Sequence, residues 1–137
     1  MSTCRVNIEY QYSLLNSSNL KITRVELRDT VTVLYFRTKA TPGNWIRIPA
    51  NTYIQPAGDT TKYFVKRTEG IPFDKEYYMP DSGVARYAVD FPAINKNTAV
   101  IDYGEDAPNG WKIYDIQLTR PEYQWLYRQC DPAGGGR

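Results

Sequence analysis

Two groups of carboxylates are the residues in this 137-residue chain whose types and spacing are best suited to chemistry. One group gathers in an acidic, turn-rich stretch: Asp102, Glu105 and Asp106, with Asn109. Oxygen ligands of this kind bind Ca²⁺, but the spacing matches no EF-hand loop, so a solvated acidic hairpin is the favoured interpretation. The other group, Asp74 and Glu76, would form an acid–base pair only across a cleft, and nothing in the sequence places them so.

The chain contains no histidine. Histidine is the commonest general base and a frequent zinc ligand, so its absence removes the usual forms of both sites. The sequence also lacks the G-x-S-x-G motif of a nucleophile elbow, a C-x-x-C motif and a phosphate-binding loop. We therefore predict a protein that is not an enzyme, with no catalytic residues, no metal site and no cofactor.

Aromatic residues offer the remaining binding chemistry, since the chain holds 12 Tyr, 3 Trp and 4 Phe. Exposed rings in one plane would form a platform for a sugar, whereas a tyrosine at the rim with its hydroxyl in water would have no such role. A tryptophan beside an arginine along a strand is either a binding feature or cation–π packing. On these grounds the candidate ligand-binding residues are Trp45, Arg47, Tyr53 and Trp111.

Charge is unevenly divided along the chain, although the formal net charge is only +2. Residues 1–69 carry ten Lys/Arg against five Asp/Glu, a net charge of +5, and residues 70–137 carry seven against ten, a net charge of −3. Either the two halves attract each other within the fold, or one polarised surface meets a charged partner. The small net charge does not indicate nucleic-acid binding.

Two cysteines, Cys4 and Cys130, lie near opposite ends of the chain. A bond between them would stabilise the fold by about 4–5 kcal/mol in the chain-entropy model if the termini meet. Two free thiols are the alternative. Cys4 also follows a short start, as a lipidated cysteine does once a lipoprotein leader is trimmed, which makes a lipid anchor at Cys4 a third interpretation. No apolar run reaches the roughly 18–20 residues of a membrane helix, and no signal peptide is visible.

Short runs of alternating apolar and polar residues dominate the sequence, which is the pattern of half-buried strands. We predict about nine strands at spacings of roughly eight to twelve residues. These strands predict an all-β fold, an antiparallel two-sheet β-sandwich of immunoglobulin-like type. A phase shift in the apolar positions predicts a bulge near Thr23, after which Arg24, Glu26 and Arg28 face water.

The predicted sandwich covers residues 1–119, and the character of the sequence then changes. Pro121 would open a short helix with its apolar side at Tyr123, Trp125, Leu126 and Tyr127. The glycines at 134–136 are typical of a flexible linker. We therefore assign residues 120–137 to a C-terminal extension or linker.

The stretch from Gly70 to Gly83, GIPFDKEYYMPDSG, breaks the strand alternation. Its prolines, charged residues and large apolar residues predict a connection that crosses between the two layers. The core anchors predicted for this connection are Ile71, Phe73 and Met79.

A series of different short motifs follows one after another over about residues 20–119. The motifs are Trp45-Ile46-Arg47-Ile48, Tyr53-Ile54, Gly70-Ile71-Pro72-Phe73-Asp74, Met79-Pro80-Asp81-Ser82-Gly83, Phe91-Pro92, Ile101-Asp102-Tyr103-Gly104-Glu105 and Trp111-Lys112-Ile113-Tyr114-Asp115-Ile116. In this order they resemble the N-terminal β-sandwich module of cell-envelope proteins from gut bacteria, which often precedes a thioredoxin-like thiol–disulfide domain. The resemblance implies a periplasmic or outer-membrane-associated setting and an accessory role. It brings no catalytic residues to this chain.

The expected function is therefore that of a non-enzymatic accessory or interaction module of a cell-envelope protein, which binds a partner protein or a neighbouring domain. A carbohydrate-binding module that uses exposed aromatic rings is the alternative. An enzyme using the Asp74/Glu76 or Asp102/Glu105 carboxylates is a third class, which would need a cleft between the two groups.

Overall fold

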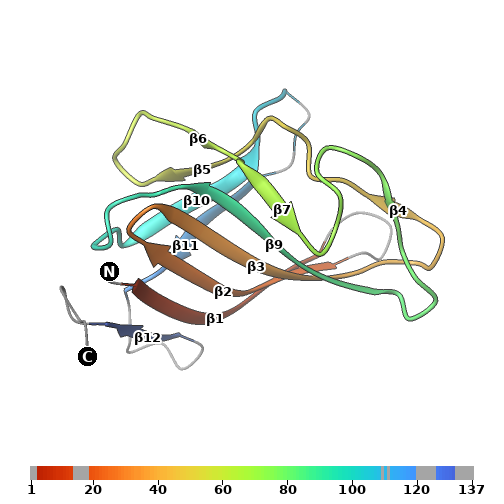
Figure 1. The fold of residues 1–137 in the computed structure, drawn as a ribbon, viewed down its shortest axis with the longest axis horizontal. Helices are drawn as coiled ribbons and strands as arrows, with labels where there is room; N and C mark the ends of the chain where they lie inside the picture. Colours follow the sequence, from red (N-terminus) through yellow and green to blue (C-terminus); the bar gives the residue numbers. More distant parts are fainter. Residues whose placement is uncertain (1–2, 14–18, 109, 111, 120–125, 132–137) are drawn as a thin grey trace.

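The computed structural model describes residues 3–13, 19–108, 110, 112–119 and 126–131. This part of the chain forms twelve strands and no helix, and so it holds no helix able to cross a membrane (Figure 1). In chain order the strands are β1 (Thr3–Ser13), β2 (Asn19–Arg28), β3 (Val31–Lys39), β4 (Trp45–Ile46), β5 (Thr52–Pro56), β6 (Tyr63–Phe64), β7 (Arg67–Glu69), β8 (Tyr77–Tyr78), β9 (Val84–Pro92), β10 (Val100–Glu105), β11 (Lys112–Gln117) and β12 (Tyr127–Cys130). The all-β prediction is confirmed, with twelve strands in place of about nine.

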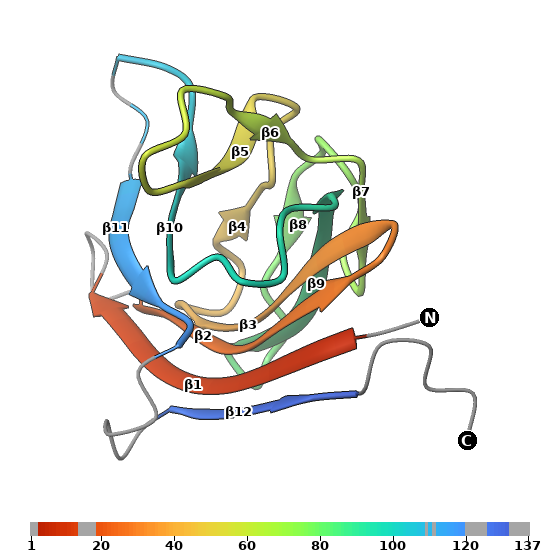
Figure 2. The same cartoon turned by 90° about the vertical axis from the view of Figure 1, so that its left-hand side faces the viewer.

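The strands form three antiparallel sheets. A six-stranded sheet has the order β12-β1-β2-β3-β9-β7, a four-stranded sheet the order β11-β10-β5-β6, and β4 pairs with β8. Figure 2 shows the four-stranded sheet lying over one side of the curved six-stranded sheet. The arrangement is consistent with the predicted β-sandwich.

Aromatic rings from both large sheets meet in the core. The centroid of the Phe36 ring in β3 lies 5.1 Å from that of Tyr103 in β10, and Phe91 in β9 meets the Tyr103 ring edge-on at 6.2 Å. Phe36 also stacks on Tyr87 in β9 at 5.3 Å. Burial raises the pKa of Tyr87 to about 12, so its phenol stays neutral near Thr38, whose Oγ1 lies 2.8 Å from the hydroxyl. These ring contacts join the two sheets.

The predicted bulge near Thr23 is confirmed, because the pairing of β2 with β3 shifts register between Ile22 and Arg24. A bulge places one extra residue on one strand and so changes which residues face the core. The apolar residues on both sides of the shift are thereby buried: Leu20, Ile22, Val25 and Leu27.

The segment Gly70–Gly83 joins β7 to β9, which are neighbours in one sheet. The predicted crossing between layers is therefore wrong. Ile71 and Met79 are buried as predicted, but Phe73 is 42% exposed and is not a core anchor. Gly70 has a φ of +95°, and a Cβ on it would lie 2.7 Å from the carbonyl oxygen of Arg86. A glycine is needed there because the chain turns directly against β9.

The same segment also contains a short strand that pairs outside the six-stranded sheet. Its strand β8 pairs with β4, and the backbone N–H of Met79 donates to the carbonyl oxygen of Asn44 at 2.7 Å. Figure 1 places β4 at the end of the molecule opposite β12. The segment therefore fixes the position of β4, which carries one of the candidate site residues.

The C-terminal residues that the structure describes belong to the main sheet. Strand β12 pairs with β1, with Cys4 opposite Cys130, and these two cysteines form a disulfide. Tyr127 therefore lies in a strand, and the predicted helix is wrong at this residue; its positions Pro121, Tyr123 and Trp125 lie outside the described residues. The sheet thus extends past the predicted boundary at residue 119. A sulfur bonded to another cysteine cannot also carry a lipid, so the disulfide excludes a lipid anchor at Cys4.

Candidate functional site

The side of the six-stranded sheet that points away from the four-stranded sheet is here called the outer face. Alternate residues of each strand project from it, because their neighbours are buried in the core. Across β1, β2, β3, β9 and β7 it carries Arg5, Lys21, Arg24, Glu26, Arg28, Val33, Tyr35, Arg37, Arg67, Glu69, Arg86, Ala88 and Asp90. Basic residues outnumber acidic ones on this face.

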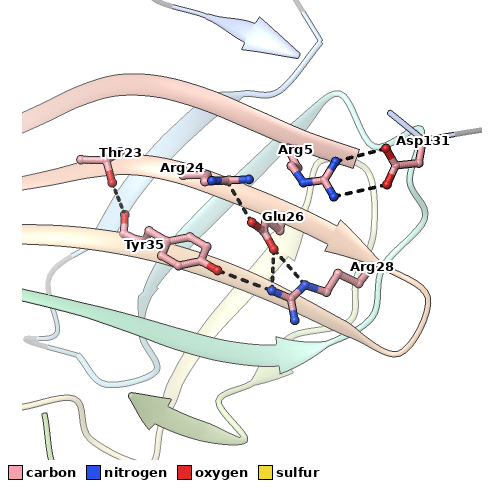
Figure 3. Close-up of polar contacts among 7 residues, drawn as sticks. All are labelled: Arg5, Thr23, Arg24, Glu26, Arg28, Tyr35 and Asp131. Carbon is pink, nitrogen blue, oxygen red and sulfur yellow. Dashed lines mark hydrogen bonds and ion pairs between the residues drawn. The ribbon is translucent and has the colours of Figure 1, made fainter. Parts of the chain in front are cut away.

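One part of the outer face, here called the paired region, matches each arginine with a carboxylate. Glu26 is only 6% exposed and lies between Arg24 and Arg28 (Figure 3). Its carboxylate accepts a hydrogen bond from Arg28 Nε at 2.9 Å, and its other oxygen lies 2.9 Å from Arg24 Nε. A buried carboxylate needs such partners, since an unpaired one would be strongly destabilising.

Tyr35 lies at the centre of the paired region. Its hydroxyl oxygen is 3.5 Å from Arg28 Nη2, and the Arg24 guanidinium lies 5.8 Å from the centre of its ring. Burial, and then the nearby charge of Glu26, raise the pKa of the Tyr35 phenol. The hydrogen bond between Arg28 and Glu26 raises the pKa of the Arg28 guanidinium. At neutral pH the Tyr35 phenol therefore stays neutral and the Arg28 guanidinium stays charged.

A groove of about 390 Å³ opens on the outer face beside Tyr35. Arg28, Arg67 and Arg86 line it, together with the acidic residues Glu69 and Asp90. Arg67 Nε donates to Asp90 Oδ2 at 2.9 Å, so this arginine is also held by an ion pair.

The groove has an apolar floor. Val33 and Ala88 lie on it, and both are buried although they project from the outer face. The aliphatic stems of arginines commonly cover apolar surface in this way while the charged ends stay in water. The groove thus combines apolar and charged surface.

A second part of the outer face, here called the cation row, consists of Arg37 and Arg86. In the strand register Lys21 of β2 lies opposite Arg37 of β3, which in turn lies opposite Arg86 of β9. The next outward residue of β3 is another cation, Lys39. Like charges directly opposite each other destabilise a sheet. The fold therefore tolerates an unfavourable arrangement here.

No carboxylate among the described residues pairs with Arg37 or Arg86. Arg37 Nε is also buried without a hydrogen-bond partner in the described part of the chain. The two arginines of the cation row therefore differ from Arg24, Arg28 and Arg67, each of which lies in an ion pair with a carboxylate.

Of the four residues predicted to bind a ligand, Trp45, Arg47 and Tyr53 lie among the described residues. Trp45 on β4 is 54% exposed, and Arg47 close to it is exposed and donates to Asp74 Oδ1 from Nη2 at 2.8 Å. Trp111 lies outside the described residues. Trp45 and Arg47 thus remain surface residues.

Tyr53 is only 3% exposed, so its assignment to an exposed platform is wrong. The pairing of β5 with β6 brings the Phe64 ring edge-on to the Tyr53 ring, with 6.2 Å between centroids. Lys62 Nζ lies 5.0 Å from the centre of the same ring. A strand contact and a lysine stem therefore cover a ring that the sequence pattern placed on the surface.

Tyr78 is the aromatic neighbour of Trp45 that the site prediction missed. It is 64% exposed and lies directly opposite Trp45 in the β4–β8 pairing. The two side chains therefore share one face of this small sheet. The sequence shows a tyrosine at this position of the irregular stretch. It does not show the strand pairing that brings Tyr78 beside Trp45.

Three of the carboxylates proposed for chemistry, Asp74, Asp102 and Asp106, make other contacts. Asp74 pairs with Arg47, Asp102 accepts a hydrogen bond from the backbone N–H of Asp115 at 2.9 Å, and Asp106 pairs with Lys62 at 2.9 Å. Within the described ranges no three acidic, cysteine or histidine side chains gather to hold a metal ion. Asn109, the remaining member of the acidic loop, lies outside the described residues.

Several ion pairs join the basic half of the sequence to the acidic half. They are Arg5–Asp131, Arg47–Asp74, Lys62–Asp106 and Arg67–Asp90. Ion pairs within the fold thus partly compensate the uneven charge of the two halves, as one of the two interpretations predicted.

Comparison of the chain with protein-family models, with curated proteins and with solved structures finds no match.

Proposed function

We propose that this chain is a non-enzymatic interaction module of a cell-envelope protein, which binds a partner protein or a neighbouring domain through its outer face. The groove of about 390 Å³ on that face carries the proposal. Arginine and tyrosine are enriched among the residues that contribute most to protein interfaces, and Arg28, Tyr35 and Arg67 line the groove. Ion pairs hold both arginines in place before binding, so little side-chain freedom would be lost on association.

Two observations support the cell-envelope setting. The motifs over about residues 20–119 resemble an envelope β-sandwich module that often precedes a thioredoxin-like domain. The disulfide between Cys4 and Cys130 fits an oxidising compartment such as the periplasm. The immunoglobulin-like class of the sandwich belongs to the same proposal.

Site-specific photo-crosslinking tests the interaction. Glu69 is replaced with p-benzoylphenylalanine, because its exposed side chain lines the groove. The control carries the same probe at Tyr114, an exposed residue of β11 in the other large sheet. We expect the probe at Glu69 to capture one protein in cells and the probe at Tyr114 not to capture it.

The captured protein is then purified and its affinity for the unlabelled chain is measured. We expect Arg67→Ala to weaken this affinity by about tenfold, as truncation of an interface arginine often does. Capture from both probe positions alike, or an affinity that Arg67→Ala leaves unchanged, would show that the outer face is not the binding surface.

Carbohydrate binding is a second candidate function, and the exposed pair Trp45 and Tyr78 favours it. Two neighbouring exposed rings present apolar faces on which a sugar ring can stack. A glycan array tests this directly with the native chain, Trp45→Ala and Tyr78→Ala. Binding that both variants abolish supports the function, and an array without signal for the native chain removes it.

A further inference from the structure

The cation row concentrates positive charge at one end of the outer face. Its two arginines stand on the adjacent strands β3 and β9, in direct register, and Lys39 is the next outward residue of β3. Adjacent strands lie about 4.8 Å apart and alternate residues of one strand about 7 Å apart, so these three cations lie within roughly 10 Å of one another. That span suits two or three anionic groups of one short ligand segment.

The same sheet shows that the missing counter-charges are a local feature. Arg24, Arg28 and Arg67 lie on the same face and each meets a carboxylate, from Glu26 or from Asp90. The strands β3 and β9 supply only Tyr35 and Ala88 to the neighbouring row on one side, and Lys39 and Val84 to the row on the other side. Nothing in these rows of β3 and β9 neutralises Arg37 or Arg86.

We propose that the cation row, extended by Lys39, binds carboxylates of an acidic segment in the partner protein. This inference rests on the proposed function and names the chemistry of the contact. Each guanidinium offers a planar fork of donors that matches a carboxylate in two hydrogen bonds.

The surroundings of the row favour a short acidic segment over a long polyanion. Glu69 and Asp90 line the groove beside Arg86. A nucleic-acid backbone that followed the face beyond the row would meet these carboxylates and be repelled. An acidic protein segment can end its run of charge at Arg86 and place neutral or basic residues in the groove.

Binding of a synthetic peptide, Gly-Glu-Gly-Glu-Gly-Glu-Gly, to the full chain at low salt tests the proposal. The matched control peptide carries Gln in place of each Glu. The test variant is Arg37→Gln with Arg86→Gln, and the control variant is Lys75→Gln, which removes one exposed cation from the Gly70–Gly83 segment. Thermal unfolding of every variant shows whether the fold is retained.

We expect the Glu peptide to bind and the Gln peptide not to bind. Arg37→Gln with Arg86→Gln should weaken the affinity about fivefold or more, while Lys75→Gln changes it by less than about twofold. The double variant should unfold at the same temperature as the native chain or higher, because it removes a like-charge contact.

No binding of the Glu peptide, or an equal loss in the two variants, would overturn the proposal. So would full displacement of the peptide by inorganic phosphate at the same concentration, since the row would then be a site for a small anion. A partner captured by the probe at Glu69 with an affinity that the double variant leaves unchanged would refute the acidic contact while leaving the proposed function in place.

Discussion

The paired region and the cation row lie on the same face, share the strands β3 and β9, and both contain arginines. They differ in their carboxylates. Glu26 and Asp90 compensate Arg24, Arg28 and Arg67 within the fold, whereas Arg37 and Arg86 oppose each other without such a partner among the described residues. The comparison shows that the sheet can compensate its arginines where stability alone matters. The part without compensation is where an external anion has most to gain.

Removing Glu26 should have the largest effect, because it would turn the paired region into a second row of unpaired cations. We expect Glu26→Ala to lower the free energy of unfolding by about 2–3 kcal/mol, the scale of hydrogen bonds to charged groups. Urea denaturation measures this. The control is Glu69→Ala, whose exposed ion pair with Arg67 at 3.6 Å should contribute less than about 1 kcal/mol. Equal losses in the two variants would mean that Glu26 is not the centre of the region.

Charge reversal at Arg67 and at Arg86 should change stability in opposite directions. Arg67→Glu places a carboxylate opposite Asp90 and should destabilise the fold, whereas Arg86→Glu places one opposite Arg37 and should stabilise it. Each change is expected to be roughly 0.2–1 kcal/mol, as for other cross-strand charge pairs. Thermal unfolding of both variants at low salt gives the two signs. A loss of stability in both would contradict the difference between the regions.

The smallest expected effect is the salt dependence of the difference in stability between Arg67→Glu and Arg86→Glu. Raising the salt from 0.1 M to 1 M shortens the Debye length from about 10 Å to about 3 Å and screens exposed charges. The difference in stability between Arg67→Glu and Arg86→Glu should therefore fall to less than about half. A difference that persists in 1 M salt would have to come from packing, and not from charge.

The strand alternation in the sequence was sufficient to predict the all-β fold and much of the core. It also located the bulge near Thr23, because a phase shift in apolar residues is a local signal that a bulge produces directly. Ile71 and Met79 were recognised as buried residues within an irregular stretch. In each case the pattern lies within a few consecutive residues.

The errors arose where residues far apart in sequence determine exposure. Tyr53 is covered because β6 lies beside β5, and Phe73 is exposed although Ile71 and Met79 of the same segment are buried. Glu26 was predicted to face water, and it does project from the outer face, but the flanking arginines bury it. The cation row depends on the pairing of β3 with β9 and so has no signature in any single stretch of sequence.

The most direct test of the central claim is the affinity of Arg86→Glu for the Gly-Glu-Gly-Glu-Gly-Glu-Gly peptide, measured on protein whose thermal unfolding is recorded from the same sample. The account predicts a variant at least as stable as the native chain that binds the peptide about tenfold more weakly, since reversing one charge in a short row removes an attraction and adds a repulsion. A variant that is less stable than the native chain and binds the peptide equally well would contradict it.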